Sequence, residues 1–228
     1  MRYILIVLMM WAPLLVDAQQ YQLVIHREGR TPMRIDICDI DSMTIEEKAT
    51  ENHEYVDLGL SVLWATCNIG AEMPEQYGHY FAWGETEPKE TYTADNYQHA
   101  TNNGYVWLGN DIARSDYDTA YLCWQGEWRM PTIQEAEELG KKCTWTWTSV
   151  NGINGYKVTG PSGNHIFLPA AGQMREQNLN QGATGYYWTS TQSEEYSSAA
   201  YNLNFTGYDG RWSANRAYGF SIRPVMDK

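Results

Sequence analysis

The fold is decided by one stretch, Gly126-Glu127-Trp128-Arg129-Met130-Pro131-Thr132, which leads into Ile133-Gln134-Glu135-Ala136-Glu137-Glu138-Leu139. Met130 precedes a proline and is therefore pushed away from the helical region. Thr132 is a candidate N-cap, and Glu135 three residues later completes a capping box. Leu139 supplies an apolar position, and Gly140 is predicted to end the helix. The stretch predicts a capped surface helix that follows a buried tryptophan.

Composition and charge limit the size of the fold and the kinds of ligand that the chain is expected to bind. The chain has 228 residues, enough for one full domain with a small appendage. It contains 17 Tyr and 10 Trp but only 4 Phe, and rings with a polar group suit half-buried surfaces and ligand contacts. The formal net charge is −12, without a basic run, so the chain should repel phosphate backbones. We therefore expect no nucleic-acid partner.

The first 18 residues have the pattern of a secretory signal peptide. Arg2 provides the charged start, residues 4–16 form a short apolar run, and Val16-Asp17-Ala18 fits a cleavage site that leaves Gln19 first. The run is too short for a membrane anchor and contains Pro13. We expect an exported protein, in the periplasm, on the outer surface or secreted, with no membrane span after cleavage.

The remainder divides into three parts. Residues 19–45 alternate apolar and polar side chains on both sides of Glu28-Gly29-Arg30, which predicts a small β-hairpin unit. Residues 46–53 are polar and predict a linker. Residues 54–228 form the main domain, with a long irregular loop over 84–117 and a short helix over 118–124. Strands are predicted at 56–60, 62–66, 144–150, 156–159, 165–169, 186–190, 201–206 and 211–215, with turns at Asn151-Gly152, Asn154-Gly155 and Asp209-Gly210. The fold class is α+β, mostly β.

Several blocks of the main domain resemble the Fibrobacter succinogenes major paralogous domain family. They span Glu54 to Val225 in order and comprise Tyr55–Leu60, Leu63–Gly70, Tyr80–Thr86, Trp124–Thr132, Cys143–Trp147, Asn154–Thr159, Ile166–Gly172, Tyr187–Ser190 and Tyr218–Val225. The resemblance implies a C-type lectin-like fold, in which the N- and C-terminal strands pair and loops form a binding face. The N-terminal hairpin is similar to units on exported proteins of gut anaerobes, so the resemblance points to a Bacteroidetes-type bacterium.

The chain contains four cysteines. Cys38, Cys67, Cys123 and Cys143 allow three full pairings, among which spacing does not choose. Because Cys67 and Cys143 lie in the shared blocks, the resemblance implies this pair. The sequence lacks a CxxC motif, a Cys/His cluster and the calcium motifs of C-type lectins. We expect no metal and no cofactor.

An enzymatic role is disfavoured. The end of the chain faintly resembles formylglycine-generating enzymes, but these need late cysteines, and no cysteine follows Cys143. Glu135, Glu137 and Glu138 share one predicted helix, whereas acid/base pairs face each other across a cleft. Arg129 and Arg223 are expected to make structural hydrogen bonds. Most of the shared tryptophans are expected in the core, namely Trp64, Trp83, Trp124, Trp128, Trp145, Trp147 and Trp188.

The sequence favours a binding module that recognises an extracellular glycan or protein ligand, with a structural or adhesion component of the cell surface as the alternative. If Tyr201, Leu203 and Phe205 face inward, their neighbours in the strand face outward. Large aromatic, arginine and amide side chains dominate binding surfaces. The predicted ligand-binding residues are Asn202, Asn204, Tyr208, Arg211, Trp212, Asn215 and, in the long loop, Trp107.

Overall fold

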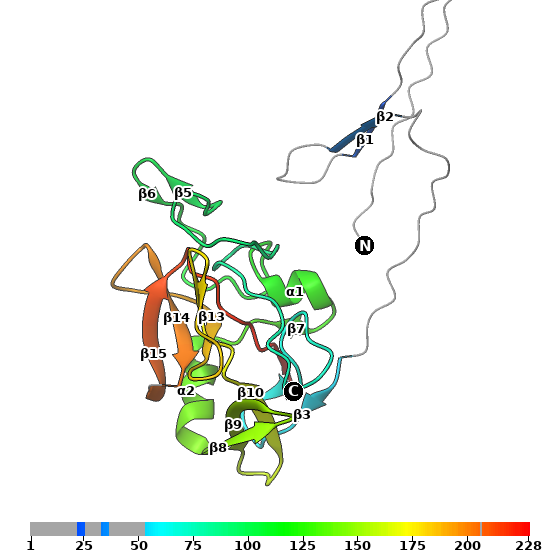
Figure 1. Ribbon diagram of the computed structural model, residues 1–228, viewed down its shortest axis with the longest axis vertical. Helices are drawn as coiled ribbons and strands as arrows, with labels where there is room; N and C mark the ends of the chain where they lie inside the picture. Colours follow the sequence, from blue (N-terminus) through cyan, green and yellow to red (C-terminus); the bar gives the residue numbers. More distant parts are fainter. Residues whose placement is uncertain (1–21, 26–32, 37–52, 206) are drawn as a thin grey trace, which may run out of the picture. The chain divides into compact units, whose positions relative to one another are not determined.

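The computed structural model describes residues 22–25, 33–36, 53–205 and 207–228, without the side chains of residues 22 and 207–211. The chain divides into two compact units, Met1–Ala49 and Thr50–Lys228, which we call unit 1 and unit 2. In unit 1, strands β1 (Gln22–Ile25) and β2 (Met33–Asp36) pair antiparallel, as the alternation predicts (Figure 1). The predicted turn and the predicted signal peptide lie outside the described residues.

Unit 2 is an α+β fold rich in short antiparallel strands (Figure 1). A four-stranded sheet has the order β3 (Tyr55–Val56), β4 (Val62–Ala65), β16 (Val225–Asp227), β7 (Trp128–Arg129). The strand β16 at the end of the chain thus lies between β4 and β7, with Val225 paired to Trp64 on one side and to Arg129 on the other. The pairing of early and late strands closes unit 2.

Two three-stranded sheets complete the main framework. One has the order β10 (His165–Pro169), β9 (Ile153–Thr159), β8 (Thr144–Val150), and the other has the order β13 (Tyr186–Gln192), β14 (Ala199–Asn204), β15 (Gly207–Asn215). Two small hairpins are β5 (Ala100–Thr101) with β6 (Gly104–Tyr105), and β11 (Met174–Arg175) with β12 (Asn178–Leu179). The hairpin β5–β6 lies within the predicted long loop, which is otherwise irregular from 84 to 117.

Two predicted turns fall inside strands instead. Asn154 and Gly155 belong to β9, because the Asn151-Gly152 turn just before them has already reversed the chain. Asp209 and Gly210 belong to β15, and the reversal occurs earlier, since Asn204 pairs with Gly207. A turn dipeptide therefore marks a reversal of the chain only where the strands on its two sides pair with each other.

The two helices of the described residues are α1 (Thr119–Trp124) and α2 (Ile133–Lys142). The capping box is confirmed: Thr132 Oγ1 accepts from the Glu135 amide, and Glu135 Oε2 accepts from the Thr132 amide at 2.7 Å. The predicted stop at Gly140 is wrong, because α2 continues to Lys142 and is capped by Cys143. Buried Ala136 and Leu139 anchor this helix on the core, which outweighs the weak helix propensity of glycine.

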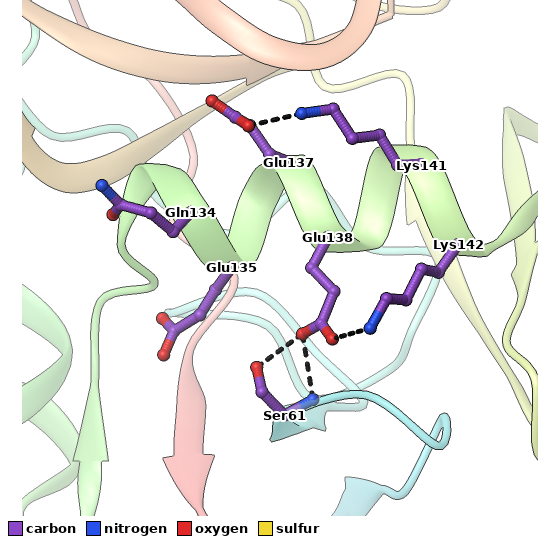
Figure 2. Close-up of a pocket in the computed structure, with 7 residues that line it drawn as sticks. All are labelled: Ser61, Gln134, Glu135, Glu137, Glu138, Lys141 and Lys142. Atoms are coloured by element: carbon purple, nitrogen blue, oxygen red, sulfur yellow. Dashed lines mark hydrogen bonds and ion pairs between the residues drawn. The ribbon is translucent and has the colours of Figure 1, made fainter.

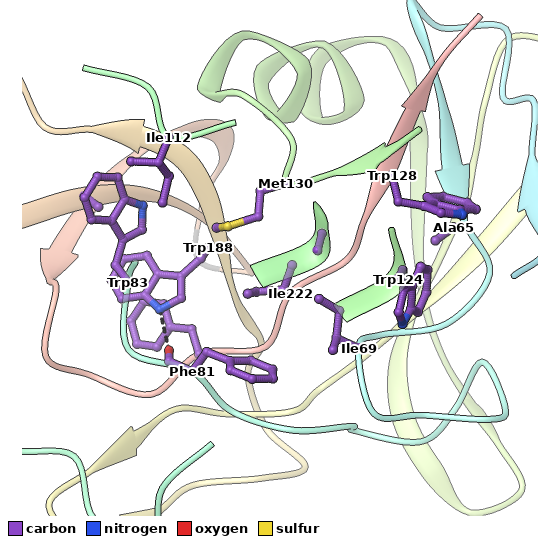
Figure 3. Packing of buried hydrophobic residues seen from close by; sticks show 13 residues of the cluster. Ala65, Ile69, Phe81, Trp83, Ile112, Trp124, Trp128, Met130, Trp188 and Ile222 are labelled. Atoms are coloured by element: carbon purple, nitrogen blue, oxygen red, sulfur yellow. Dashed lines mark hydrogen bonds between the residues drawn. The ribbon is translucent and has the colours of Figure 1, made fainter. Parts of the chain in front are cut away.

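The stretch from Gly126 to Thr132 lies at the centre of the packing of unit 2. Trp128 is buried and meets Trp124 edge-on, with ring centroids 5.2 Å apart. Figure 3 shows both rings in one core cluster with Trp83, Trp188 and Met130. Five of the seven shared tryptophans are buried, as predicted; Trp145 is half-buried, and Trp147 is 44% exposed, so it is not core.

Two of the arginines are structural, as expected. Arg129 donates to both Glu135 oxygens and to Asp227, which links α2 to the end of the chain. Arg223 is fully buried and donates to the Asn68 amide oxygen and to the carbonyls of Ala65, Thr66 and Phe167. Burial lowers the pKa of Arg223. Both side chains tie together segments that are distant in sequence.

Candidate functional site

The predicted outward orientation of Asn202 and Asn204 is wrong. Both side chains are buried, with 1% and 2% of their surface exposed. The strand β14 is the central strand of its sheet and is covered on both faces, so the alternation of side chains does not separate core from solvent. The Asn202 amide donates to the Trp212 carbonyl at 2.8 Å, and the Asn204 amide donates to Asn202 at 3.3 Å. Asn202 therefore holds β14 against β15, and neither side chain reaches the surface.

The remaining predicted ligand-binding residues, apart from Trp107, lie on the strand β15. Trp212 is 50% exposed, as the prediction requires. Asn215 is half-buried, and its side-chain oxygen accepts from the Tyr105 hydroxyl at 3.1 Å and from the Ala217 amide at 2.9 Å. The side chains of Tyr208 and Arg211 lie outside the described residues. The Tyr105 contact fastens the hairpin β5–β6 to the end of β15 (Figure 1).

Arg216 directly follows β15 and is fully buried. Its guanidinium carbon lies 4.7 Å from the centre of the Trp83 ring and 5.4 and 5.7 Å from those of Tyr97 and Tyr105. Three rings thus surround the cation, which is the arrangement that favours a guanidinium on aromatic faces. The Arg216 Nε atom donates to the Tyr97 hydroxyl, and this hydroxyl donates to the Trp83 carbonyl at 2.7 Å. Burial raises the pKa of Tyr97, so the phenol keeps its proton.

The same guanidinium joins two surface segments. Its Nη1 atom donates to the Val106 carbonyl at 3.0 Å and to the Ser197 carbonyl at 3.1 Å. Further along, the Gln192 amide donates to the Asn110 carbonyl, and Asp111 forms a bridge with Thr191. The segment from Val106 to Asp111 and the segment from Thr191 to Ser197 therefore lie side by side above Arg216.

The two segments present large exposed side chains. Val106 is 42% exposed, and Trp107 and Tyr196 are each 60% exposed. We call Trp107 and Tyr196 the aromatic rim, which Val106 adjoins. Glu194 and Glu195 beside Tyr196 are exposed as well, so the rim carries carboxylates at one side. Underneath, His99 contacts the Gly84 carbonyl at 2.9 Å, and burial lowers the pKa of His99. The imidazole is therefore neutral at pH 7.

The sequence singles out Trp107 but neither Arg216 nor Tyr196. Tyr196 stands alone among Ser and Glu residues, which is the same signal that singled out Trp107. Arg216 has no comparable signal, because nothing in Asn-Arg-Ala-Tyr indicates that the arginine is enclosed by rings from the distant loop. The structure brings Trp107 and Asn215 into the same region, and it places Trp212 three residues before Asn215 on the same strand.

The three glutamates of α2 line a surface hollow of about 410 Å³ together with Ser61, Gln134, Lys141 and Lys142 (Figure 2). Glu138 accepts from the Ser61 amide at 2.9 Å and from Lys142 at 2.8 Å, which lowers its pKa against the opposing effect of burial. Glu137 pairs with Lys141, and Glu135 is held by Arg129 and the cap. Each carboxylate has a structural partner, and none faces another across a cleft.

The implied pairing of Cys67 with Cys143 does not occur in the structure, where both are thiols. Burial raises the pKa of the Cys143 thiol to about 11, with a smaller contribution from Glu138. Cys38 lies outside the described residues. Within the described ranges, no group of three or more His, Cys, Asp or Glu side chains is placed to hold a metal ion. None of the helices in the described part of the chain has the length and apolar character to cross a membrane.

The comparisons with known proteins concern the second half of the chain. A family model described as "Domain of unknown function (DUF8237)" matches residues 130–225. The matched segment includes α2, the two three-stranded sheets, Tyr196 and Arg216, whereas Trp107 lies outside it. Neither the curated proteins nor the solved structures gave a match.

Proposed function

We propose that the chain is an exported, non-catalytic binding module and that the aromatic rim is its ligand-binding face. The observation that carries the proposal is the double hydrogen bond of Arg216 to Val106 and Ser197, which fixes the two segments that bear Trp107 and Tyr196. A surface that presents rigid aromatic side chains loses little conformational entropy when a ligand binds.

The chemistry of the rim supports a glycan or a peptide as the ligand. Exposed indole and phenol rings offer flat apolar faces together with a polar group, which suits both sugar rings and peptide side chains. The same two segments carry exposed polar side chains, with Asn110 on one and Glu194 and Glu195 on the other. The net charge of −12 disfavours polyanionic ligands.

Two further parts of the proposal rest on the sequence. Residues 1–18 support export, and the nine shared blocks support membership of the Fibrobacter succinogenes major paralogous domain family, with a C-type lectin-like fold. The pairing of β4 with β16 agrees with the strand pairing that this fold implies. The structural partners of Glu135, Glu137 and Glu138 support a non-catalytic role, since these carboxylates hold α2 in place.

A binding screen followed by matched variants tests the proposal. Glycan and peptide arrays are probed with the exported protein, and affinities for any ligand found are measured by calorimetry. Trp107→Ala and Tyr196→Ala should each weaken binding by about tenfold or more, the effect of removing an aromatic anchor. The melting temperature should hardly change, because both side chains are 60% exposed.

Tyr55→Ala is the matched control. Tyr55 is 53% exposed on β3, in the four-stranded sheet. The Tyr55→Ala variant should therefore bind the ligand as the wild type does. If the Tyr55 variant loses affinity while both rim variants keep it, the ligand-binding face lies elsewhere and the proposal is wrong.

A further inference from the structure

The strand β8 forms one edge of the sheet β10–β9–β8 (Figure 1). All seven of its residues, Thr144 to Val150, pair with β9 in an unbroken antiparallel register. Asn151 and Gly152 connect the two strands, with φ angles of 48° and 82°. Two positive φ values identify the two-residue turn whose twist matches antiparallel strands.

This turn determines which backbone groups of β8 point away from β9. Val150 and Ile153 flank the turn and exchange hydrogen bonds, and hydrogen-bonded positions then alternate along the strand. Thr148, Thr146 and Thr144 therefore bond to β9. The N–H and C=O groups of Trp147 and Ser149 point to the open side of the sheet, where they offer two donors and two acceptors to another strand.

The features that usually prevent edge pairing are absent from β8. Natural edge strands are protected by lysine, proline, bulges or short length. The sequence Thr-Trp-Thr-Trp-Thr-Ser-Val contains no charge and no proline, and the pairing with β9 contains no bulge. Trp147 is 44% exposed at this edge and meets Tyr156 edge-on, with ring centroids 4.9 Å apart. An apolar ring therefore accompanies the open backbone groups.

We propose that β8 pairs antiparallel with β8 of a second copy of this chain, which joins two three-stranded sheets into one continuous six-stranded sheet. The strand is complementary to itself about Trp147. With Trp147 opposite Trp147 of the second copy, Thr146 faces Thr148 and Thr144 faces Val150. Facing aromatic rings and facing threonines are favourable cross-strand pairs. The Trp147 pair lies on the two-fold axis, and each of the other pairings is made twice, because the arrangement is isologous.

Charge does not oppose a second copy at this edge. Two chains with a net charge of −12 repel each other, but β8 itself carries no charge, so pairing there places no like charges opposite one another.

Sedimentation equilibrium of the exported protein tests the pairing. The wild type should form dimers in a concentration-dependent manner, and the dimer should become more stable between 0.05 and 0.5 M salt, since salt screens the repulsion between the copies. Ser149→Lys places a charge at the paired edge in both copies and should weaken dimerisation by about tenfold or more. A wild-type chain that remains monomeric at all concentrations would overturn the proposal and leave the edge open to an extended segment of another protein.

Two variants separate pairing from folding. Ser149→Pro removes an N–H that points away from β9, so it should abolish the dimer while the hairpin β8–β9 is retained. Ser213→Lys is the matched control for Ser149→Lys, because Ser213 is exposed on β15, an edge strand of the other three-stranded sheet. This variant should remain dimeric. A dimer that survives both Ser149 variants with unchanged affinity uses a different surface, and the proposal is then wrong.

Discussion

Arg223 and Arg216 are both fully buried, and they hold two regions of unit 2 in different ways. Arg223 bonds to Asn68 and to carbonyls of Ala65, Thr66 and Phe167, in and beside the strands of the framework. Arg216 bonds to carbonyls of Val106 and Ser197, two exposed residues of irregular segments. Arg223 therefore holds together segments of the interior, whereas Arg216 holds two surface segments in place.

The acceptors explain why the two regions should respond differently to mutation. A buried carbonyl that loses its donor remains buried and unsatisfied, whereas a carbonyl beside exposed side chains can turn to water. The region around Arg223 should therefore lose stability as a whole, and the region around Arg216 should lose local order. Variants of the two arginines test this difference, and variants of Thr132 and Asp227 then measure single contacts of the framework; the expected loss in the free energy of unfolding decreases in this order.

Arg223→Met should cause the largest loss of stability, about 3–5 kcal/mol, because several buried acceptors lose their donor at once and each costs about 1–3 kcal/mol. Urea denaturation monitored by tryptophan fluorescence measures the change. Arg114→Met is the control: Arg114 is 37% exposed and paired with Glu127 and Asp227, and its loss should cost less than about 1 kcal/mol. Equal midpoints for the two variants would show that Arg223 does not hold the framework.

Arg216→Met should cost less than Arg223→Met, about 1–3 kcal/mol, since methionine still fills the space among Trp83, Tyr97 and Tyr105. The local effect should be greater than the global one. Amide hydrogen exchange should accelerate in residues 106–111 and 191–198 and remain unchanged in β4 and β16. If exchange accelerates equally in all of these segments, the distinction between the two arginines fails.

Thr132→Ala should destabilise unit 2 by about 1 kcal/mol, through loss of the side-chain bond to the Glu135 amide at the start of α2. Thr132→Ser keeps the hydroxyl and should stay within a few tenths of a kcal/mol of the wild type. Urea midpoints of the two variants provide the test. A serine variant as unstable as the alanine variant would assign the effect to the lost methyl group.

Asp227→Asn should have the smallest effect, about 0.2–1 kcal/mol at pH 7, because the Asp227 side chain is 54% exposed. Hydrogen bonds from Arg129 lower the pKa of Asp227 in the folded chain. The carboxylate therefore stabilises the fold above its unfolded pKa of about 3.9, and this contribution disappears as the pH falls through the lower, folded value. The wild type and the variant should converge below the folded pKa, where the carboxyl is protonated. A difference that persists there would exclude the ion pair as its cause.

Local signals in the sequence predicted the elements that depend on near neighbours. The capping box needs only Thr132 and Glu135, and the turn after β8 needs only Asn151-Gly152. The prediction failed where distant segments decide. Gly140 continues α2 because Leu139 is buried beside it, and the amides of β14 are buried because both faces of this strand are covered.

The candidate site was predicted only in part, for the same reason. Trp107 and Trp212 stood out as large aromatic residues in polar surroundings, and both are exposed. Nothing near Arg216 in the sequence reveals that residues more than 100 positions earlier supply the hydroxyl and one of the two carbonyls to which it bonds. Likewise, the outward groups of β8 follow from the turn, but the open edge follows from the order of the strands in the sheet.

By itself, the sequence determined the α+β class, the start of α2, most strands and most of the tryptophan core, because capping, turn geometry and apolar patterning act over a few residues. Only the tertiary structure decided that β16 lies between β4 and β7, that Asn202 and Asn204 are buried, and that Arg216 joins Val106 to Ser197. These features depend on which segments meet in space, and that is set by the packing of the whole unit.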